Sequence, residues 1–125
     1  HDVWCGPGTV KGEAAGCPAR FTCPLPEDIR RQLRVKEGFL ASGDIFVDNP
    51  DDLRRILDLY PDAKAVDMES AAIAQVCYIK NVPFVCIRVV SDTPGDGGNA
   101  AAYENFWQAA PERTFDEVEK LLGLL

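Results

Sequence analysis

The sequence predicts an α/β protein whose central sheet is largely parallel. Three apolar runs, at residues 35–41, 64–66 and 83–90, have the composition of strands, and helical patterns separate them. Each run ends in a short polar segment. Because parallel neighbours in a sheet need a crossover connection such as a helix, this alternation indicates a parallel sheet flanked by helices.

Composition and charge narrow the class of protein. The 125 residues are enough for one small domain with a core, and the hydrophobic fraction of 46% is that of a globular chain. The net charge of −7 disfavours nucleic acid and anionic membranes as partners. No apolar run has the length of a membrane span and no signal peptide is visible, so we expect a cytoplasmic protein.

The chain has the features of a piece of a longer protein. Its single methionine is Met68, in mid-chain, and its first residues resemble the interior of a domain. Residues 1–25 hold many of the glycines and prolines, and we expect a loop there.

The five cysteines do not form a disulfide scaffold, because their number is odd and their spacing is irregular. Cys77 and Cys86 lie within apolar elements and are predicted to be buried thiols. Cys5, Cys17 and Cys23 lack the closely paired spacing of a zinc site, so we interpret them as ordinary thiols. The sequence indicates neither a metal nor an organic cofactor.

The first elements after this loop are a short helix and a strand. Pro26 suits the first position of a helix that continues through Leu33. The apolar run at 35–41 is the first strand, and it ends at a polar turn at 42–44. A short apolar run follows at 45–47.

A second helix has a strong start signal at Asn49. Its side chain can accept hydrogen bonds from helix N–H groups, Pro50 fixes a backbone angle suited to the first turn, and acidic residues follow. Apolar residues then recur at helical spacing: Leu53, Ile56, Leu57 and Tyr60. Pro61 ends this helix, and the run at 64–66 forms the next strand.

An alanine-rich helix is predicted directly after this strand. Ala72, Ile73, Val76 and Cys77 recur at spacings of three and four, which is typical of one helix face. Asn81 suits the left-handed position that ends a helix.

The last third of the chain is predicted to be a strand and an interrupted helix. Residues 83–90 are almost continuously apolar, as in a strand buried on both faces. The pattern is helical from Asn99 on, Pro111 breaks it, and Thr114 with Glu117 forms a capping box that restarts it. The final apolar stripe consists of Leu121, Leu122 and Leu125.

The carboxyl ends of the predicted strands carry the residues suited to chemistry: Phe46, Asp67, Glu69, Arg88 and Asp92. In a parallel sheet these ends meet at one edge, where ligands bind in open α/β folds. A carboxyl group there could protonate a leaving base, a second could bind vicinal sugar hydroxyls, and an aromatic ring could stack on the base. The combination indicates cleavage of a glycosidic bond between a sugar and a base.

Each of these residues also has a plainer structural interpretation. Asp92 alone would most often form a turn or a helix cap, and Glu69 alone could favour a helix start. Phe46 alone would most often lie in a core. Arg88 is harder to explain in this way, because a guanidinium within an apolar strand needs an acidic partner such as Glu69 or Asp92.

Three stretches of the sequence match a known pattern. Residues 66–77 read VDMESAAIAQVC, residues 81–92 read NVPFVCIRVVSD, and residues 42–47 read SGDIFV. Together they resemble the 5′-methylthioadenosine/S-adenosylhomocysteine nucleosidases, a family of the nucleoside phosphorylase superfamily. The resemblance implies that residues 1–125 are the carboxyl-terminal part of a single domain. It also implies a three-layer fold with a mixed, largely parallel sheet flanked by helices, of which this chain is an incomplete part.

The resemblance implies an activity and the residues that act on the base. The reaction would be hydrolysis of the N-glycosidic bond of 5′-methylthioadenosine and S-adenosylhomocysteine, which releases adenine and the thioribose for purine and methionine salvage. Asp92 would be the catalytic acid toward the five-membered ring of adenine, and Ser91 would position it. Phe46 would stack on adenine, and the backbone of Val47 would bind the base edge.

The resemblance also assigns residues to the sugar. Glu69 would bind the ribose hydroxyls, and Met68 would pack on the sugar face. Tyr103 falls where the family places an aromatic residue near the substrate. Arg88 matches the family's arginine and is expected to form ion pairs in the cleft, whereas Asp67 replaces an expected glutamate and its role is open.

The resemblance finally implies parts that this chain lacks. In the family, a glutamate near the amino terminus of the full domain activates the attacking water, and no residue here matches that position. We therefore expect the isolated chain to be inactive and its sheet to have an unsatisfied edge. The resemblance implies a homodimer whose partner chain lines part of the alkylthio pocket.

Two alternatives stay open at this point. A phosphorylase of the same superfamily would use phosphate instead of water as the nucleophile. A truncated remnant with a binding or dimerising role would not be an enzyme at all. The sequence does not decide between methylthioadenosine, adenosylhomocysteine and deoxyadenosine as substrates.

Overall fold

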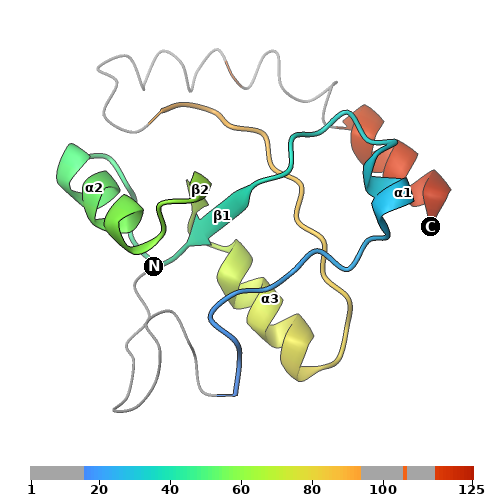
Figure 1. Ribbon diagram of the computed structural model, residues 1–125, viewed down its shortest axis with the longest axis horizontal. Coiled ribbons are helices and arrows are strands. Elements are labelled where there is room, and N and C mark those ends of the chain that lie inside the picture. The colour runs from blue at the N-terminus through green and yellow to red at the C-terminus, as the bar shows by residue number, and fades with distance from the viewer. Residues whose placement is uncertain (1–15, 94–105, 107–114) are drawn as a thin grey trace.

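The computed structural model describes residues 16–93, 106 and 115–125, and its architecture is α/β, as predicted (Figure 1). The elements, in chain order, are α1 (Glu27–Arg30), β1 (Phe39–Ser42), α2 (Pro50–Leu59), β2 (Ala63–Asp67) and α3 (Ser70–Ile79). Residues 115–124 are also helical and lie beside α1 in the figure.

The two strands form a parallel pair, and α2 is the crossover that connects them. Leu40 lies opposite Ala65, Ala41 opposite Val66, and Ser42 opposite Asp67. The predicted parallel arrangement is therefore confirmed for these strands, and their carboxyl ends share one edge. Within the described residues this sheet has two strands, so each strand is paired along one side.

The predicted start of α2 is confirmed in detail. The side-chain oxygen of Asn49 accepts hydrogen bonds from the backbone N–H groups of Asp51 (3.1 Å) and Asp52 (2.9 Å), and Pro50 is the first helical residue. Ile56 is fully buried, whereas Leu57 of the predicted apolar stripe is 40% exposed, so the stripe faces the protein interior only in part. The predicted end of α3 is confirmed as well, because Asn81 has a left-handed φ of 55°.

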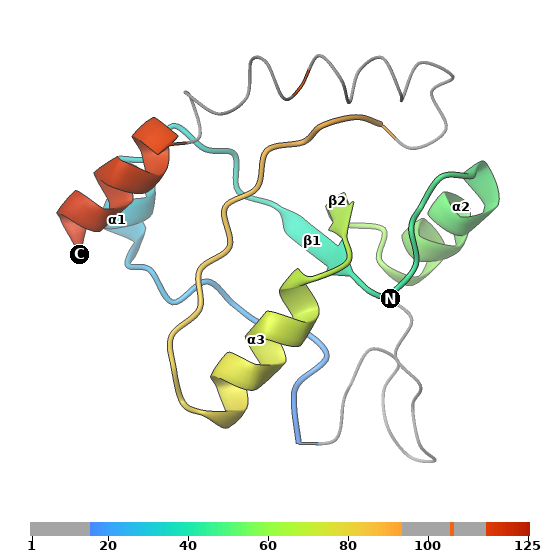
Figure 2. The same cartoon turned by 180° about the vertical axis from the view of Figure 1, so that it is seen from behind.

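The strand predicted at 83–90 is not formed. The segment leaves α3 and runs extended without pairing to a described strand (Figures 1 and 2). Its apolar side chains are used for packing instead: Val85 and Ile87 contact the core cluster made of Leu25, Leu33 and Leu121. A continuous apolar run indicates that its side chains will be buried. A strand also needs a neighbouring strand with which to form backbone hydrogen bonds.

Several predicted boundaries in the first half were wrong. The first helix covers only Glu27–Arg30, because the chain turns after it and places Leu33 in the core. The first strand begins at Phe39 rather than at Val35, which is 39% exposed. No helix or strand was predicted for the apolar run at 45–47, and the structure has none there.

The predicted thiol burial was only partly right. Cys77 is half-buried, and Cys86 is exposed because the segment that carries it is covered on one side only. Cys17, interpreted as an ordinary thiol, is buried, and its sulfur lies 3.9 Å from the carbonyl oxygen of Gln75 in α3.

The carboxyl-terminal helix differs from its predicted pattern. Leu121 is buried and Leu124 packs beside it, whereas Leu122 and Leu125 are exposed. Glu117 accepts a hydrogen bond from the backbone N–H of Arg34 at 2.8 Å, which ties this helix to the turn after α1. The predicted helix from Asn99, the break at Pro111 and the cap at Thr114 lie outside the described residues.

The outer face of α3 is apolar and largely uncovered. Ile73, Val76 and Ile79 are 48%, 60% and 64% exposed, whereas the buried positions of this helix are Ser70 and Ala74. A helix that is apolar all round is normally covered on several sides, so α3 has more apolar surface than the described residues can cover. Across the described segments, no helix has both the length and the apolar character needed to cross a bilayer.

Candidate active site

The site is built at the shared carboxyl edge of β1 and β2. Ser42 and Asp67 are paired at the ends of the two strands, and α3 begins three residues after Asp67. The first N–H groups of α3 are bound by these two side chains. The N–H of Ala71 donates to Ser42 Oγ at 2.9 Å, and the N–H of Ser70 donates to Asp67 Oδ1 at 3.3 Å.

Glu69 occupies the cap position of α3 but does not cap it with its side chain. The helix start is already satisfied by Ser42 and Asp67, so the plainer interpretation of Glu69 as a helix-starting residue loses its support. Its side chain is 62% exposed, and its Oε2 lies 3.7 Å from Arg88 Nη2. Glu69 therefore presents a carboxylate at the strand edge, next to a positive charge.

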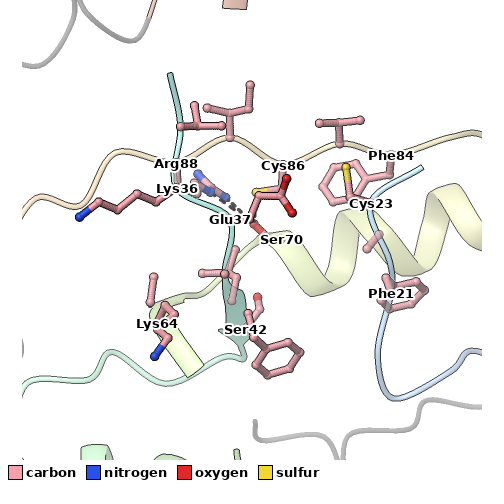
Figure 3. A pocket seen from close by; sticks show the side chains of 18 of the residues that line it. Phe21, Cys23, Lys36, Glu37, Ser42, Lys64, Ser70, Phe84, Cys86 and Arg88 are labelled. Carbon is pink, nitrogen blue, oxygen red and sulfur yellow. Dashed lines mark hydrogen bonds between the residues drawn. The ribbon is translucent and has the colours of Figure 1, made fainter. Parts of the chain in front are cut away.

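Arg88 reaches this edge from the 82–93 segment (Figure 3). Its Nη2 lies 2.7 Å from Asp67 Oδ2, and its Nη2 and Nε donate to Ser70 Oγ at 2.9 and 3.3 Å. The predicted need for an acidic partner is thus confirmed with Asp67 as the close partner and Glu69 as a more distant one. The structure gives no ion pair between Arg88 and Asp92, the other partner suggested by the sequence. We call Ser42, Asp67, Glu69, Ser70 and Arg88 the Arg88 cluster.

The Arg88 cluster keeps Asp67 ionised. Burial alone would raise the pKa of this carboxyl, but hydrogen bonds from Ser42 and Ser70 and the charge of Arg88 outweigh it, so the pKa lies below its usual value. Burial likewise opposes the charge on Arg88, and the neighbouring Asp67 overcomes this effect and raises the pKa of the guanidinium. The pair is therefore charged across the whole range of ordinary pH.

The residues predicted to contact the base lie in an exposed loop after β1. Phe46 is 71% exposed, and its ring makes no stacking contact with another described aromatic side chain. Val47, next to it, is half-buried. A ring with this exposure is not a core residue, which was the plainer interpretation of Phe46.

The other predicted residues fall in separate places. Met68 is 40% exposed beside Glu69, and the hydroxyl of Ser91 donates a short hydrogen bond to Asp92 Oδ1. The structure thus brings together Glu69 with Arg88, and Ser91 with Asp92. Tyr103 lies outside the described residues.

A large, mostly apolar cleft opens next to the Arg88 cluster. Its volume is about 1230 Å³, and Ser42, Ser70 and Arg88 line it together with residues of β1, α3 and the 84–90 stretch. Figure 3 shows Arg88, Ser70 and Cys86 grouped along its wall, with Ser42 at the end of β1. Among the described residues, no three His, Cys, Asp or Glu side chains are grouped so that they could hold a metal ion.

Sequence reasoning missed the parts played by Ser42 and Ser70 and left Asp67 without a role. Ser70 directly follows Glu69, and Ser42 ends the first strand, so both stood within the recognised motifs. Small hydroxyl residues in such positions are common in turns and helix starts. Only the structure shows that both face the carboxylate of Asp67, Ser42 through the strand register and Ser70 through its hydrogen bond at the start of α3.

Comparison with known proteins places this architecture in a superfamily. The family model described as the phosphorylase superfamily matches residues 13–123, and the chain therefore belongs to this superfamily. Within it, the chain is similar to the 5′-methylthioadenosine/S-adenosylhomocysteine nucleosidase of Actinobacillus succinogenes, with 38% identity over 94% of this chain and 53% of that protein. The enzyme of the same name from Haemophilus influenzae is 37% identical over 94% of this chain and 54% of its own length.

These matches confirm the resemblance that the motifs predicted. They also show that the chain spans about half the length of the curated relatives it matches.

Proposed function

We propose that this chain forms the carboxyl-terminal part of a longer nucleosidase domain, called the full-length protein below. The full-length protein would hydrolyse the N-glycosidic bond of 5′-methylthioadenosine and S-adenosylhomocysteine, acting as a homodimer in the cytoplasm. The observation that carries the proposal is an exposed carboxylate, Glu69, beside Arg88 at the carboxyl edge of parallel strands. It occurs in a chain similar to nucleosidases along 94% of its length.

In this proposal Glu69 binds the ribose hydroxyls. A carboxylate accepts hydrogen bonds from two vicinal hydroxyls, and charge-assisted bonds of this kind are stronger than neutral ones. The guanidinium of Arg88 lies 3.7 Å from the Glu69 carboxylate, and Met68, which precedes Glu69 in the chain, packs on the sugar.

The base is held and protonated by the other predicted residues. Phe46 stacks on adenine, Val47 binds its edge through the backbone, and Tyr103 contributes an aromatic contact. Asp92, held by Ser91, donates a proton to the five-membered ring of adenine as the bond to the sugar breaks. The electron pair of that bond leaves with the base, which departs neutral because it has gained this proton.

Water completes the reaction by attacking the sugar carbon that loses the base. The bond from water oxygen to carbon forms as the bond to adenine breaks, and the proton of the water is accepted by a carboxylate that lies outside these 125 residues. The products are adenine and the thioribose. This chain supplies sugar binding, base binding and the acid, and the rest of the domain supplies the base catalyst.

The test is product analysis with the full-length protein. Purified protein is incubated with methylthioadenosine or adenosylhomocysteine, with and without phosphate, and adenine and the sugar product are separated by chromatography. We expect adenine and free thioribose without phosphate. Release that requires phosphate and gives a sugar 1-phosphate would identify a phosphorylase instead, and no release under either condition would refute both.

A further inference from the structure

Ser70 has surroundings that its place at the start of a helix does not require. It is 5% exposed and is the buried polar residue of the described part of the chain. Its hydroxyl contacts Asp67 Oδ2 by a short hydrogen bond and both Nη2 and Nε of Arg88 at 2.9 and 3.3 Å (Figure 3). The sulfur of Cys86 lies 3.3 Å from the same oxygen.

The direction of each hydrogen bond follows from the chemistry of the partners. A guanidinium can only donate, so Ser70 Oγ must accept from Arg88. An ionised carboxylate can only accept, so the single hydrogen of the hydroxyl goes to Asp67. The hydroxyl thus donates to Asp67 and accepts from Arg88, so it links the arginine to the aspartate, with the sulfur of Cys86 beside the same oxygen.

This arrangement fixes the guanidinium of Arg88. Arg88 belongs to a segment without regular structure, and its side chain is 42% exposed. It is nevertheless held on one side by two bonds to Ser70 and by the ion pair with Asp67. With its Nε and Nη2 used in this way, the guanidinium is held with Nη2 3.7 Å from Glu69.

We propose that Ser70 is a positioning residue that orients Arg88 beside Glu69, so that the Glu69 carboxylate is held in place for the sugar hydroxyls. The kinetic part of this inference rests on the proposed function, whereas the structural part does not. A role in capping α3 would not explain the geometry, because the N–H groups of Ser70 and Ala71 already bind Asp67 and Ser42.

The kinetic test compares Ser70→Ala with Cys77→Ala in the full-length protein. Each change removes one heavy atom from α3, but Cys77 has no contact with the Arg88 cluster among the bonds the structure gives. We expect Ser70→Ala to raise KM for methylthioadenosine by roughly tenfold with a smaller change in kcat, because a charged donor loses its acceptor. Cys77→Ala is expected to leave both constants near those of the unaltered protein.

The decisive comparison repeats the Ser70→Ala substitution in a protein that already carries Arg88→Ala. If Ser70 acts through Arg88, then Ser70→Ala raises KM no further once Arg88 is absent. An equal increase of KM in both backgrounds, or no increase in either, would overturn the proposal.

A second measurement does not depend on activity. Denaturant unfolding of the unaltered full-length protein, both single variants and the double variant gives the coupling between Ser70 and Arg88. We expect the double variant to lose less stability than the sum of the losses in the two single variants. Strict additivity would contradict the positioning of Arg88 by Ser70. If the unaltered protein has no nucleosidase activity but the coupling is present, the proposed function is wrong, whereas the positioning of Arg88 by Ser70 is supported.

A spectroscopic measurement covers the case in which Ser70→Ala does not fold. In nitrogen-15 spectra of the unaltered full-length protein, the Nε–H signal that disappears in Arg88→Lys should exchange slowly with water, because it is bound to Ser70. Rapid exchange of this signal would overturn the proposal.

Discussion

Asp67 is the most constrained carboxylate of the Arg88 cluster. Its side chain is 12% exposed, and hydrogen bonds and the charge of Arg88 hold its pKa below the usual value despite its burial. A group whose pKa is lowered by folding contributes stability above its unfolded pKa, about 3.9 for aspartate. That contribution is lost as the pH falls from there through the folded pKa.

Asp67→Asn should therefore flatten the acid side of the stability curve. The expected result is a lower free energy of unfolding than in the unaltered full-length protein near pH 7, and a smaller further loss between about pH 4 and the folded pKa. Urea unfolding at a series of pH values measures this. Parallel curves for the two proteins would mean that Asp67 does not carry the effect.

Asp92 is the residue whose proposed role is chemical. Asp92→Asn cannot donate the proton that the leaving base needs, so kcat for methylthioadenosine should fall by about 10²- to 10⁴-fold, the usual worth of a general acid. Asp58→Asn, a change to an exposed carboxylate on α2, is the matched control and should leave kcat unchanged. A similar kcat in Asp92→Asn and in this control would remove Asp92 from the mechanism.

The helix α2 owes its start to local chemistry, and this can be measured separately. Asn49 accepts hydrogen bonds from two N–H groups that have no partner within the helix. Asn49→Ala should lower the free energy of unfolding of the full-length protein by about 1 kcal/mol, the typical loss for a helix cap. Asp58→Ala, on the exposed side of the same helix, should change it by less than about 0.5 kcal/mol.

In contrast to the start of α2, the packing of helix α3 and of the 82–93 segment is not determined by neighbouring residues in the chain. Their side chains are apolar on more sides than the described residues cover: Ile73, Val76 and Ile79 on α3 and Val89 and Val90 beyond it are all more than 40% exposed. The local sequence specifies the helix, whereas the described residues leave much of its apolar surface exposed. The third predicted strand runs extended but unpaired, because no described strand lies beside it to share backbone hydrogen bonds.

At the scale of the whole molecule, we predict that enzymatic activity and coverage of the apolar surface need residues beyond these 125. We expect the isolated chain to show no measurable turnover of methylthioadenosine, because the proposed function takes the water-activating carboxylate from the rest of the domain. Its cleft of about 1230 Å³ and its exposed apolar side chains should also bind a hydrophobic dye more strongly than the full-length protein does.

Both measurements use the isolated chain beside the full-length protein at equal concentration. Turnover by the isolated chain close to that of the full-length protein would show that the site is complete without further residues. That result would also require a nucleophile-activating group within this chain.

Local signals in the sequence were sufficient for those features that depend on neighbouring residues. They placed the start of α2 at Asn49 and the end of α3 at Asn81, and they predicted a parallel strand pair with acidic residues at its carboxyl edge. The motifs from Val66 to Asp92 indicated the superfamily to which the chain belongs. Caps, turns and helix periodicity act over a few residues, so they can be inferred from the order of side chains alone.

Only the tertiary structure decided which side chains meet. The sequence offered Glu69 or Asp92 as partners for Arg88, whereas the register of β1 and β2 and the path of the 82–93 segment place Arg88 chiefly against Asp67 and Ser70. The side chain of Glu69 makes no hydrogen bond that caps its helix. Pairing between residues far apart in the chain is set by strand register and by packing, and composition or spacing cannot specify these distances.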